Sequence, residues 1–105
     1  MLFRSHLVRE GAPADQKTFE ILQGAAGEAI FRFVNDAYSA DNTFFVASRG
    51  STYTVDNLRF ATAGSERLRI NSSGNVGIGL STPTTGLEIG KAAPSAAVEI
   101  GRAHV

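Results

Sequence analysis

Histidine is the side chain that most often serves as general base in nucleophilic catalysis, and this chain has two histidines. His6 lies near the start of the sequence and His104 near its end. The chain has no cysteine, which excludes a thiolate nucleophile, a disulfide and a thiolate zinc site. A Ser-His-Asp arrangement therefore has no central base, and the sequence predicts a protein that is not an enzyme and has neither cofactor nor metal site.

Two glutamates offer the remaining catalytic possibility. A pair of carboxyl groups on either side of the scissile bond is the machinery of most glycoside hydrolases. Glu20 and Glu28 are close enough in the sequence to be weighed as such a pair. The competing interpretation places both on solvent-facing strand positions, and we adopt it. A fragment of a polysaccharide depolymerase stays as an alternative.

A polar segment offers oxygen ligands of the kind that Ca²⁺ prefers. Asn35, Asp36, Asp41 and Asn42 lie within it, but their spacing differs from that of an EF-hand loop. Asn and Asp are also ordinary turn formers, so we expect a loop rather than a metal site. The GNVGIG run at 74–79 lacks the third glycine and the following helix of a dinucleotide-binding fingerprint.

Aromatic residues suggest a further alternative, a carbohydrate-binding module. A flat aromatic surface suits stacking against a sugar ring, and four aromatic side chains are candidates for one. They are Tyr38, Phe44, Phe45 and Tyr53.

Charge and hydropathy exclude two classes of partner. The chain of 105 residues carries ten basic and ten acidic side chains, spread over both halves. Neither half has the basic excess that nucleic acid or an anionic lipid surface requires, so we expect neither partner. No apolar run approaches the roughly 20 residues of a membrane span, so we expect no membrane insertion. The first ten residues lack the apolar core of a secretory signal.

Turn-forming residues divide the first part of the chain into short runs of β-forming residues. We expect strands over 17–23, 28–35, 43–48, 52–55 and 57–61, after a loose lead-in over 1–16. Short strands at this spacing indicate an all-β fold, and no segment has helical periodicity. In the second strand, Phe31 and Phe33 are expected to face the side opposite Arg32.

A shift in composition separates two regions. All seven phenylalanines and both tyrosines precede residue 61. We expect 17–61 to form a β-meander or small sandwich around a core. The members of that core are Phe19, Ile21, Phe31, Phe33, Phe44, Val46, Leu58 and Phe60. Residues 62–105 have only isolated apolar side chains of medium size. A segment of roughly 40 residues or fewer seldom folds without disulfides, metal or oligomerisation, so the sequence predicts an oligomer.

The segment Glu66–Leu80, ERLRINSSGNVGIGL, predicts a hairpin. Apolar residues alternate with polar ones or glycine on both sides of the Asn-Ser-Ser-Gly turn at 71–74. Gly77 and Gly79 lie on the face opposite Val76 and Ile78. Glycine within a strand marks a close approach by another backbone, or a strand that ends in a flexible loop. Both readings are open for this segment.

A short pattern occurs twice near the end of the sequence. Leu87–Ala92, LEIGKA, is followed eleven residues later by Val98–Ala103, VEIGRA. Copied short strands joined by turns with Pro or Gly are typical of a stacked solenoid or an intertwined shaft. Two copies also arise by chance, and that alternative stays open.

The run Gly64–Ile89, GSERLRINSSGNVGIGLSTPTTGLEI, resembles a shaft segment of bacteriophage tail fibres and related virion appendages. In that family the run often precedes an intramolecular chaperone domain. The upstream runs PADQKTFEIL and AIFRFVNDAYSADNTFFVASRG also resemble modules of phage fibres. The family commonly has a small polar residue where this chain has Leu80.

The resemblance implies a homotrimer in the virion, assembled in the cytoplasm of the bacterial host. Its partners would be other tail proteins, with a tip outside this chain reaching a host cell-surface glycan or protein. The expected fold is all-β: a meander or sandwich over 17–61, then an interwoven trimeric shaft over 62–105. The expected function is that of a rigid spacer or adhesin. The expected contacts between chains are Leu68, Ile70, Val76, Gly77, Ile78, Gly79, Leu87, Ile89, Val98 and Ile100.

Overall fold

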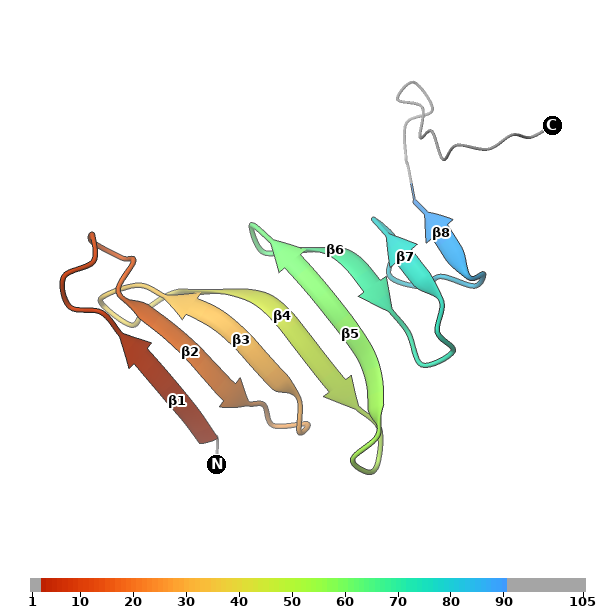
Figure 1. The fold of residues 1–105 in the computed structure, drawn as a ribbon, viewed down its shortest axis with the longest axis horizontal. Helices are drawn as coiled ribbons and strands as arrows, with labels where there is room; N and C mark the ends of the chain where they lie inside the picture. Colours follow the sequence, from red (N-terminus) through yellow and green to blue (C-terminus); the bar gives the residue numbers. More distant parts are fainter. Residues whose placement is uncertain (1–2, 91–105) are drawn as a thin grey trace, which may run out of the picture.

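The computed structural model describes residues 3–90 as one eight-stranded sheet, whose strands lie side by side in sequence order (Figure 1). Neighbouring strands are antiparallel except for the last two, which are parallel. No helix occurs in this described range, and the expected all-β class is confirmed. The strands are β1 (Phe3–Val8), β2 (Thr18–Gln23), β3 (Ala29–Val34), β4 (Asp41–Arg49), β5 (Val55–Thr62), β6 (Ser65–Ile70), β7 (Val76–Ile78) and β8 (Leu87–Ile89).

One side of this sheet is predominantly apolar, with Ser5, Gln23 and Asn42 as polar residues among its apolar ones in β1, β2 and β4. Side chains alternate along a strand, and cross-strand partners lie on the same side. An unbroken row of partners crosses seven strands: Ile21, Phe31, Phe45, Phe60, Leu68, Ile78 and Ile89. We call this side the apolar face. Its other large side chains, placed by register or by ring contacts, are Leu7, Phe19, Phe33, Phe44, Leu58, Ile70, Val76 and Leu87.

Within residues 3–90 the sheet is a single layer, and its apolar face encloses no core. The shortest dimension of the molecule is 18 Å against a longest dimension of 55 Å. Every large side chain of the apolar face keeps some exposure, with 57% for Phe33 and 40% for Ile78. The first region is thus a meander and not a sandwich, and the expected core around its phenylalanines is wrong. Val46, expected in that core, pairs with Ile30 and Arg59 on the opposite face.

Two sequence predictions about strands are corrected. The expected lead-in over 1–16 contains β1, whose six residues pair in register with β2. The expected strands at 52–55 and 57–61 are one strand, β5, preceded by bends at 51–54. The expected strands at 17–23, 28–35 and 43–48 are present within two residues at either end.

The sheet continues without interruption across the expected boundary between 17–61 and 62–105. β5 and β6 are joined by Ala63 and Gly64, which have φ values of +51° and +80°. Two central residues with positive φ define the tight hairpin turn that matches the twist of paired strands. The described part of the chain therefore has one continuous sheet where two regions were expected.

The expected hairpin over 66–80 is present as β6 and β7. Asn71 organises its turn, because its side-chain oxygen accepts hydrogen bonds from the backbone N–H groups of Ser73 and Asn75, both at 3.0 Å. Gly74 completes the turn with a φ of +84°, which only glycine adopts without a steric penalty. Local turn chemistry thus fixes the register of the hairpin.

Gly77 is covered by the chain's own loop between β7 and β8. A Cβ atom at Gly77 would lie 2.4 Å from the carbonyl oxygen of Leu80 and 3.1 Å from a ring carbon of Pro83. Pro83 is itself buried, and its carbonyl oxygen accepts a hydrogen bond of 3.1 Å from the Asn71 side chain. The close backbone approach predicted at Gly77 is therefore made within the chain. Gly79 has a φ of +70° at the start of this loop.

We predict that Gly77→Ala destabilises the β7–β8 region by about 1–3 kcal/mol, because the loop backbone must move away from the new methyl group. Urea unfolding followed by circular dichroism measures the change. Gly50→Ala is the matched control, since a Cβ there meets nothing within 4 Å and its φ is not positive. Equal stability of the two variants would contradict the intrachain role of Gly77.

Candidate functional site

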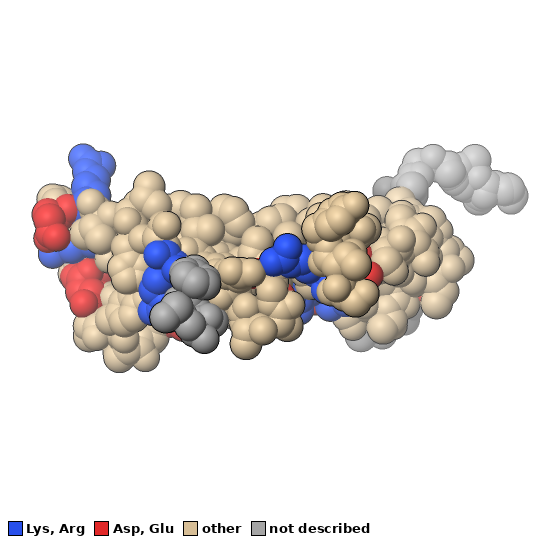
Figure 2. Space-filling view, turned by 90° about the horizontal axis from the view of Figure 1, so that it is seen from below, with Lys and Arg blue, Asp and Glu red and all other residues tan. Residues whose placement is uncertain are grey.

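The apolar face is the candidate functional site, and it is unusual because it is the less buried side of the sheet. The buried hydrophobic residues of the described range, Leu22 and Val34, lie on the opposite side. A sheet with one apolar side normally buries that side against another layer. Figure 2 shows the thin edge of the sheet from below, where acidic and basic side chains occupy only scattered positions.

Phenylalanines form a contiguous cluster on this face across β2 to β5. Phe33 and Phe44 stack with ring centroids 5.0 Å apart, and Phe19 stacks on Phe44 at 6.0 Å. Phe45 links this group to Phe60, at 5.0 Å. A bulge between β3 and β4 brings the adjacent Phe44 and Phe45 both against Phe31. Contiguous exposed apolar surface of this kind marks a surface that contacts a protein, a membrane or a ligand.

The expected contacts between chains fall into three groups. Leu68, Ile70, Val76, Ile78, Leu87 and Ile89 lie together on the apolar face. Gly77 lies on the opposite face, beside Arg69 and Glu88, and Gly79 lies at the start of the loop after β7, where an added Cβ would lie 3.0 Å from the carbonyl oxygen of Gly90. Val98 and Ile100, and with them the second copy of the eleven-residue pattern, lie outside the described residues.

The opposite face carries a charged cluster centred on Glu20, which is fully buried. Arg32 Nε donates to Glu20 Oε1 at 2.5 Å, and His6 Nε2 lies 2.6 Å from Oε2. The Tyr38 hydroxyl also donates to Oε2, and Arg4 Nη1 lies 3.5 Å from the same oxygen. Both carboxylate oxygens are engaged, so the cluster joins β1, β2, β3 and the loop after β3. Arg32 also donates to Asp41 on β4, at 3.0 Å.

The hydrogen bonds around Glu20 decide its ionisation. Burial by itself raises the pKa of the carboxyl, but the hydrogen bonds from Tyr38, Arg32 and His6 outweigh burial and lower the pKa to about 2. Glu20 is therefore a carboxylate at neutral pH and serves as the shared acceptor of the cluster. Tyr38 reaches it from a left-handed backbone conformation with a φ of +56°, which is unfavourable for an aromatic residue.

The candidate catalytic pair is not assembled. The cross-strand partner of Glu20 is Arg32, and Glu28 lies four residues before Arg32, about 13 Å along the strand. Glu28 accepts a hydrogen bond from Ala26 N in the turn before β3. The expectation that Glu20 faces solvent is wrong, because Arg32, on the same side of the neighbouring strand, covers it together with Tyr38 and His6. A β2–β3 hairpin with its turn near residue 26 places residue 20 opposite residue 32. The pairing of Glu20 with Arg32 could therefore have been predicted from the sequence.

The four aromatic residues considered for a sugar-binding surface do not lie together either. Tyr38 belongs to the charged cluster on one face, Phe44 and Phe45 belong to the apolar face, and Tyr53 lies in the β4–β5 loop with 87% exposure.

In the polar loop that was considered as a calcium site, the Asn35 side chain accepts hydrogen bonds from the backbone of Ser39 and Ala40. Across residues 3–90, no group of three His, Asp or Glu side chains is arranged to hold a metal ion.

Comparison of the chain with protein-family models, with curated proteins and with solved structures finds no match in any of the three. Within the described range, no helical segment has the length and apolar character needed to span a membrane. The geometry of the two faces therefore carries the functional argument.

We predict that the stability of the fold falls as pH is lowered from about 4.5 to about 2, partly because of Glu20. The folded-state pKa is below the ordinary value of 4.5, so Glu20 stabilises the fold fully above pH 4.5. That stabilisation is lost as protons bind towards pH 2. Glu20→Gln should lower stability at pH 7 by about 1–3 kcal/mol and should flatten the pH dependence in this window.

Urea midpoints measured at several pH values test this expectation. Glu66→Gln is the control, because Glu66 is paired with Arg69 at 2.7 Å but is partly exposed, and such pairs contribute about 0–1 kcal/mol. If Glu20→Gln keeps the full acid dependence of the wild type, the cluster does not depend on an ionised Glu20.

Proposed function

We propose that the chain is a structural segment of a phage tail fibre or similar virion appendage, acting as a homotrimeric spacer or adhesin. One observation carries the proposal: an apolar face that extends over the whole sheet and has no covering layer within residues 3–90. Copies of the same chain supply that layer. The resemblance of Gly64–Ile89 to shaft segments supports the role in a virion.

Simple geometry favours three copies around a common axis. A strand of six residues spans about 20 Å, and the centre of an equilateral triangle with such sides lies about 6 Å from each side. Packed sheets lie about 10 Å apart, so side chains reach about 5 Å from each sheet. Three sheets with their apolar faces inward would therefore fill the space between them. The charged cluster around Glu20 would then lie on the outside.

In this arrangement each strand runs across the fibre axis, and successive strands of a sheet follow one another along the axis. The middle row from Ile21 to Ile89 would line the axis over its described length. The two regions of the chain would thus form one shaft, not a separate domain followed by a shaft. Host attachment follows mechanically, because a stiff spacer holds a receptor-binding tip away from the virion.

We expect light scattering after size exclusion to give three times the chain mass of 11.1 kDa. Phe60→Ser, on the apolar face, should shift the protein towards the single-chain mass, because a polar hydroxyl would be placed in the contact between copies. Val8→Ser, on the opposite face and 51% exposed, is the matched control and should keep the trimer. A wild-type protein of single-chain mass at micromolar concentration would overturn the proposal.

For the role in the virion, gold-labelled antibodies against the chain should decorate a tail appendage in electron micrographs of phage particles whose genome encodes it. Particles of a deletion mutant are the control. Label confined to the capsid, or its absence from the particles, would refute the assignment to a tail appendage.

A further inference from the structure

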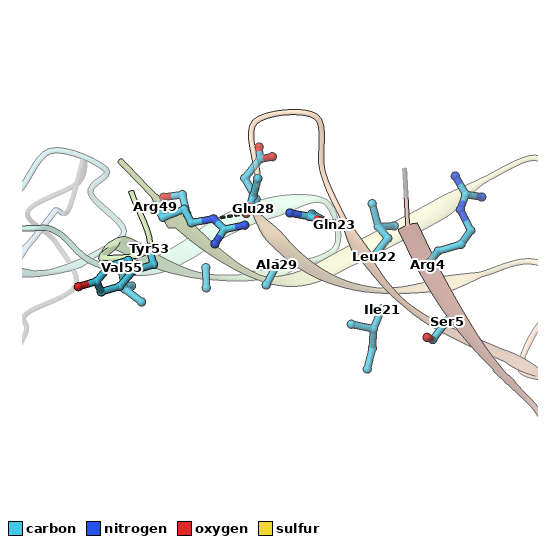
Figure 3. A pocket seen from close by; sticks show the side chains of 13 residues that line it. Arg4, Ser5, Ile21, Leu22, Gln23, Glu28, Ala29, Arg49, Tyr53 and Val55 are labelled. Atoms are coloured by element: carbon cyan, nitrogen blue, oxygen red, sulfur yellow. Dashed lines mark hydrogen bonds between the residues drawn. The ribbon is translucent and has the colours of Figure 1, made fainter. Parts of the chain in front are cut away.

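The apolar face has two unlike ends along the strands β1 to β4. At one end lie Leu7, Phe19, Phe33 and Phe44, the large side chains. At the other end Ala29 lies between Gln23 and Ala47, its cross-strand partners, and all three side chains are smaller than the phenylalanines of the first end. Figure 3 shows Ser5, Ile21 and Ala29 pointing to one side of the sheet and Leu22 to the other.

The end with small residues is an open hollow of about 670 Å³. Its lining includes Ser5, Ile21, Gln23, Ala29, Ala47 and Val55. A cavity of about 150 Å³ is sufficient for one benzene ring, so the hollow has room for more than one aromatic side chain. Glu28 and Arg49 lie at its margin, where Arg49 Nε donates to the carbonyl oxygen of Gly27 at 2.9 Å.

A chain cannot fill its own hollow with its own aromatic end. Phe33 and Ala29 lie four residues apart on β3, about 13 Å along the strand. Phe33 is 57% exposed, so much of its ring has no partner within the described part of the chain. The protruding side chains and the hollow are thus separate features of the same face, at opposite ends of the same strands.

We propose that the aromatic end of one copy, Phe19, Phe33 and Phe44, packs into the hollow of the next copy around the ring. This inference rests on the proposed function, since it names the contact that holds the copies together. A contact between two different patches closes into a ring when its rotation allows, whereas a two-fold contact joins a patch to itself. The unlike ends of the face therefore favour the cyclic arrangement over a two-fold dimer.

Charge does not oppose this contact. The aromatic end carries Lys17 and Asp36, whose charged atoms lie 3.9 Å apart. The hollow carries Glu28 and Arg49 at its margin. Arg4 also lines the hollow, and Asp15 accepts a hydrogen bond from the backbone of Asp36, so each end presents charges of both signs and opposite charges can face one another at the edge of the contact.

A cross-linking experiment tests the contact directly, because the sequence contains no cysteine. In the double variant Phe33→Cys/Ala47→Cys, the two thiols of one chain cannot meet. Asn42 is the partner of Phe33, and Ala47 lies five residues further, about 17 Å along β4, whereas a disulfide requires Cα atoms within about 7 Å. Oxidation should therefore produce a covalent trimer on a non-reducing gel.

Three controls make the result specific. Phe33→Cys alone and Ala47→Cys alone should give no cross-link. Phe33→Cys/Ser73→Cys, with the second thiol in the exposed β6–β7 turn and away from the hollow, should give none either. A dimer from Phe33→Cys alone would show that like ends meet, and would overturn the inference. A monomeric wild type would overturn the proposed function as well, so the two failures are distinguishable.

Filling the hollow gives an independent measurement. Ala47→Phe occupies the hollow from within and should raise the dissociation constant of the assembly at least tenfold, with unchanged circular dichroism. Phe33→Ala should also weaken the assembly, and the swap Phe33→Ala/Ala47→Phe should recover part of the loss, because the ring then projects from the other side of the contact. An unchanged dissociation constant for Ala47→Phe, in a trimeric background, would overturn the inference.

Discussion

The structure depends on one constraint: a single β-sheet has two faces, and an apolar face exposed to water is unfavourable. Burial of apolar surface contributes roughly 25 cal/mol per Å², and it is the dominant favourable term in folding and association. In this chain the row from Ile21 to Ile89 crosses seven strands without a polar interruption, yet none of its side chains is fully buried. The described residues thus define half of a core. In the proposed assembly, other copies of the chain supply the other half.

The opposite face holds the strands of one chain together, which is usually the role of a hydrophobic core. Arg4 and His6 on the edge strand β1, Arg32 on β3 and Tyr38 in the following loop all converge on Glu20. A buried charge is strongly unfavourable unless it is paired and hydrogen-bonded, and here every partner comes from a different element or a different strand position. The cluster therefore fixes the register of the first three strands. It involves no large side chain of the apolar face.

Much of the fold follows from local sequence. Alternation and turn chemistry predicted the β6–β7 hairpin because Asn71 and Gly74 define its turn independently of distant residues. The strand β1 was missed because its polar residues, Arg4 and His6, have a role only once β2 and β3 supply Glu20 and Arg32. Burial of Glu20 was missed for the same reason, since period-2 alternation assigns a side to each residue but does not say which side will be covered. The parallel strand β8 also needed tertiary information, because its loop folds back over Gly77.

The candidate site was predicted in part. Six apolar residues of β6 to β8 were expected to form contacts between chains, and all six lie on one face. The aromatic residues of β2 to β5 were instead assigned to an internal core, because a segment rich in phenylalanine usually encloses one. Sequence pattern alone cannot distinguish a core shared between strands of one chain from a core shared between chains. The single-layer topology shows only that the described residues of one chain do not enclose this core.

The most direct test of the central claim is the dependence of thermal unfolding on protein concentration. If the apolar face is covered by other copies, folding and assembly are linked, and the midpoint temperature should rise over a hundredfold increase in protomer concentration. The variant Phe60→Ser should start from a lower midpoint at each concentration. A midpoint that is the same at all concentrations, together with a cooperative transition, would contradict the account, because it would show that the single sheet is stable without a covering layer.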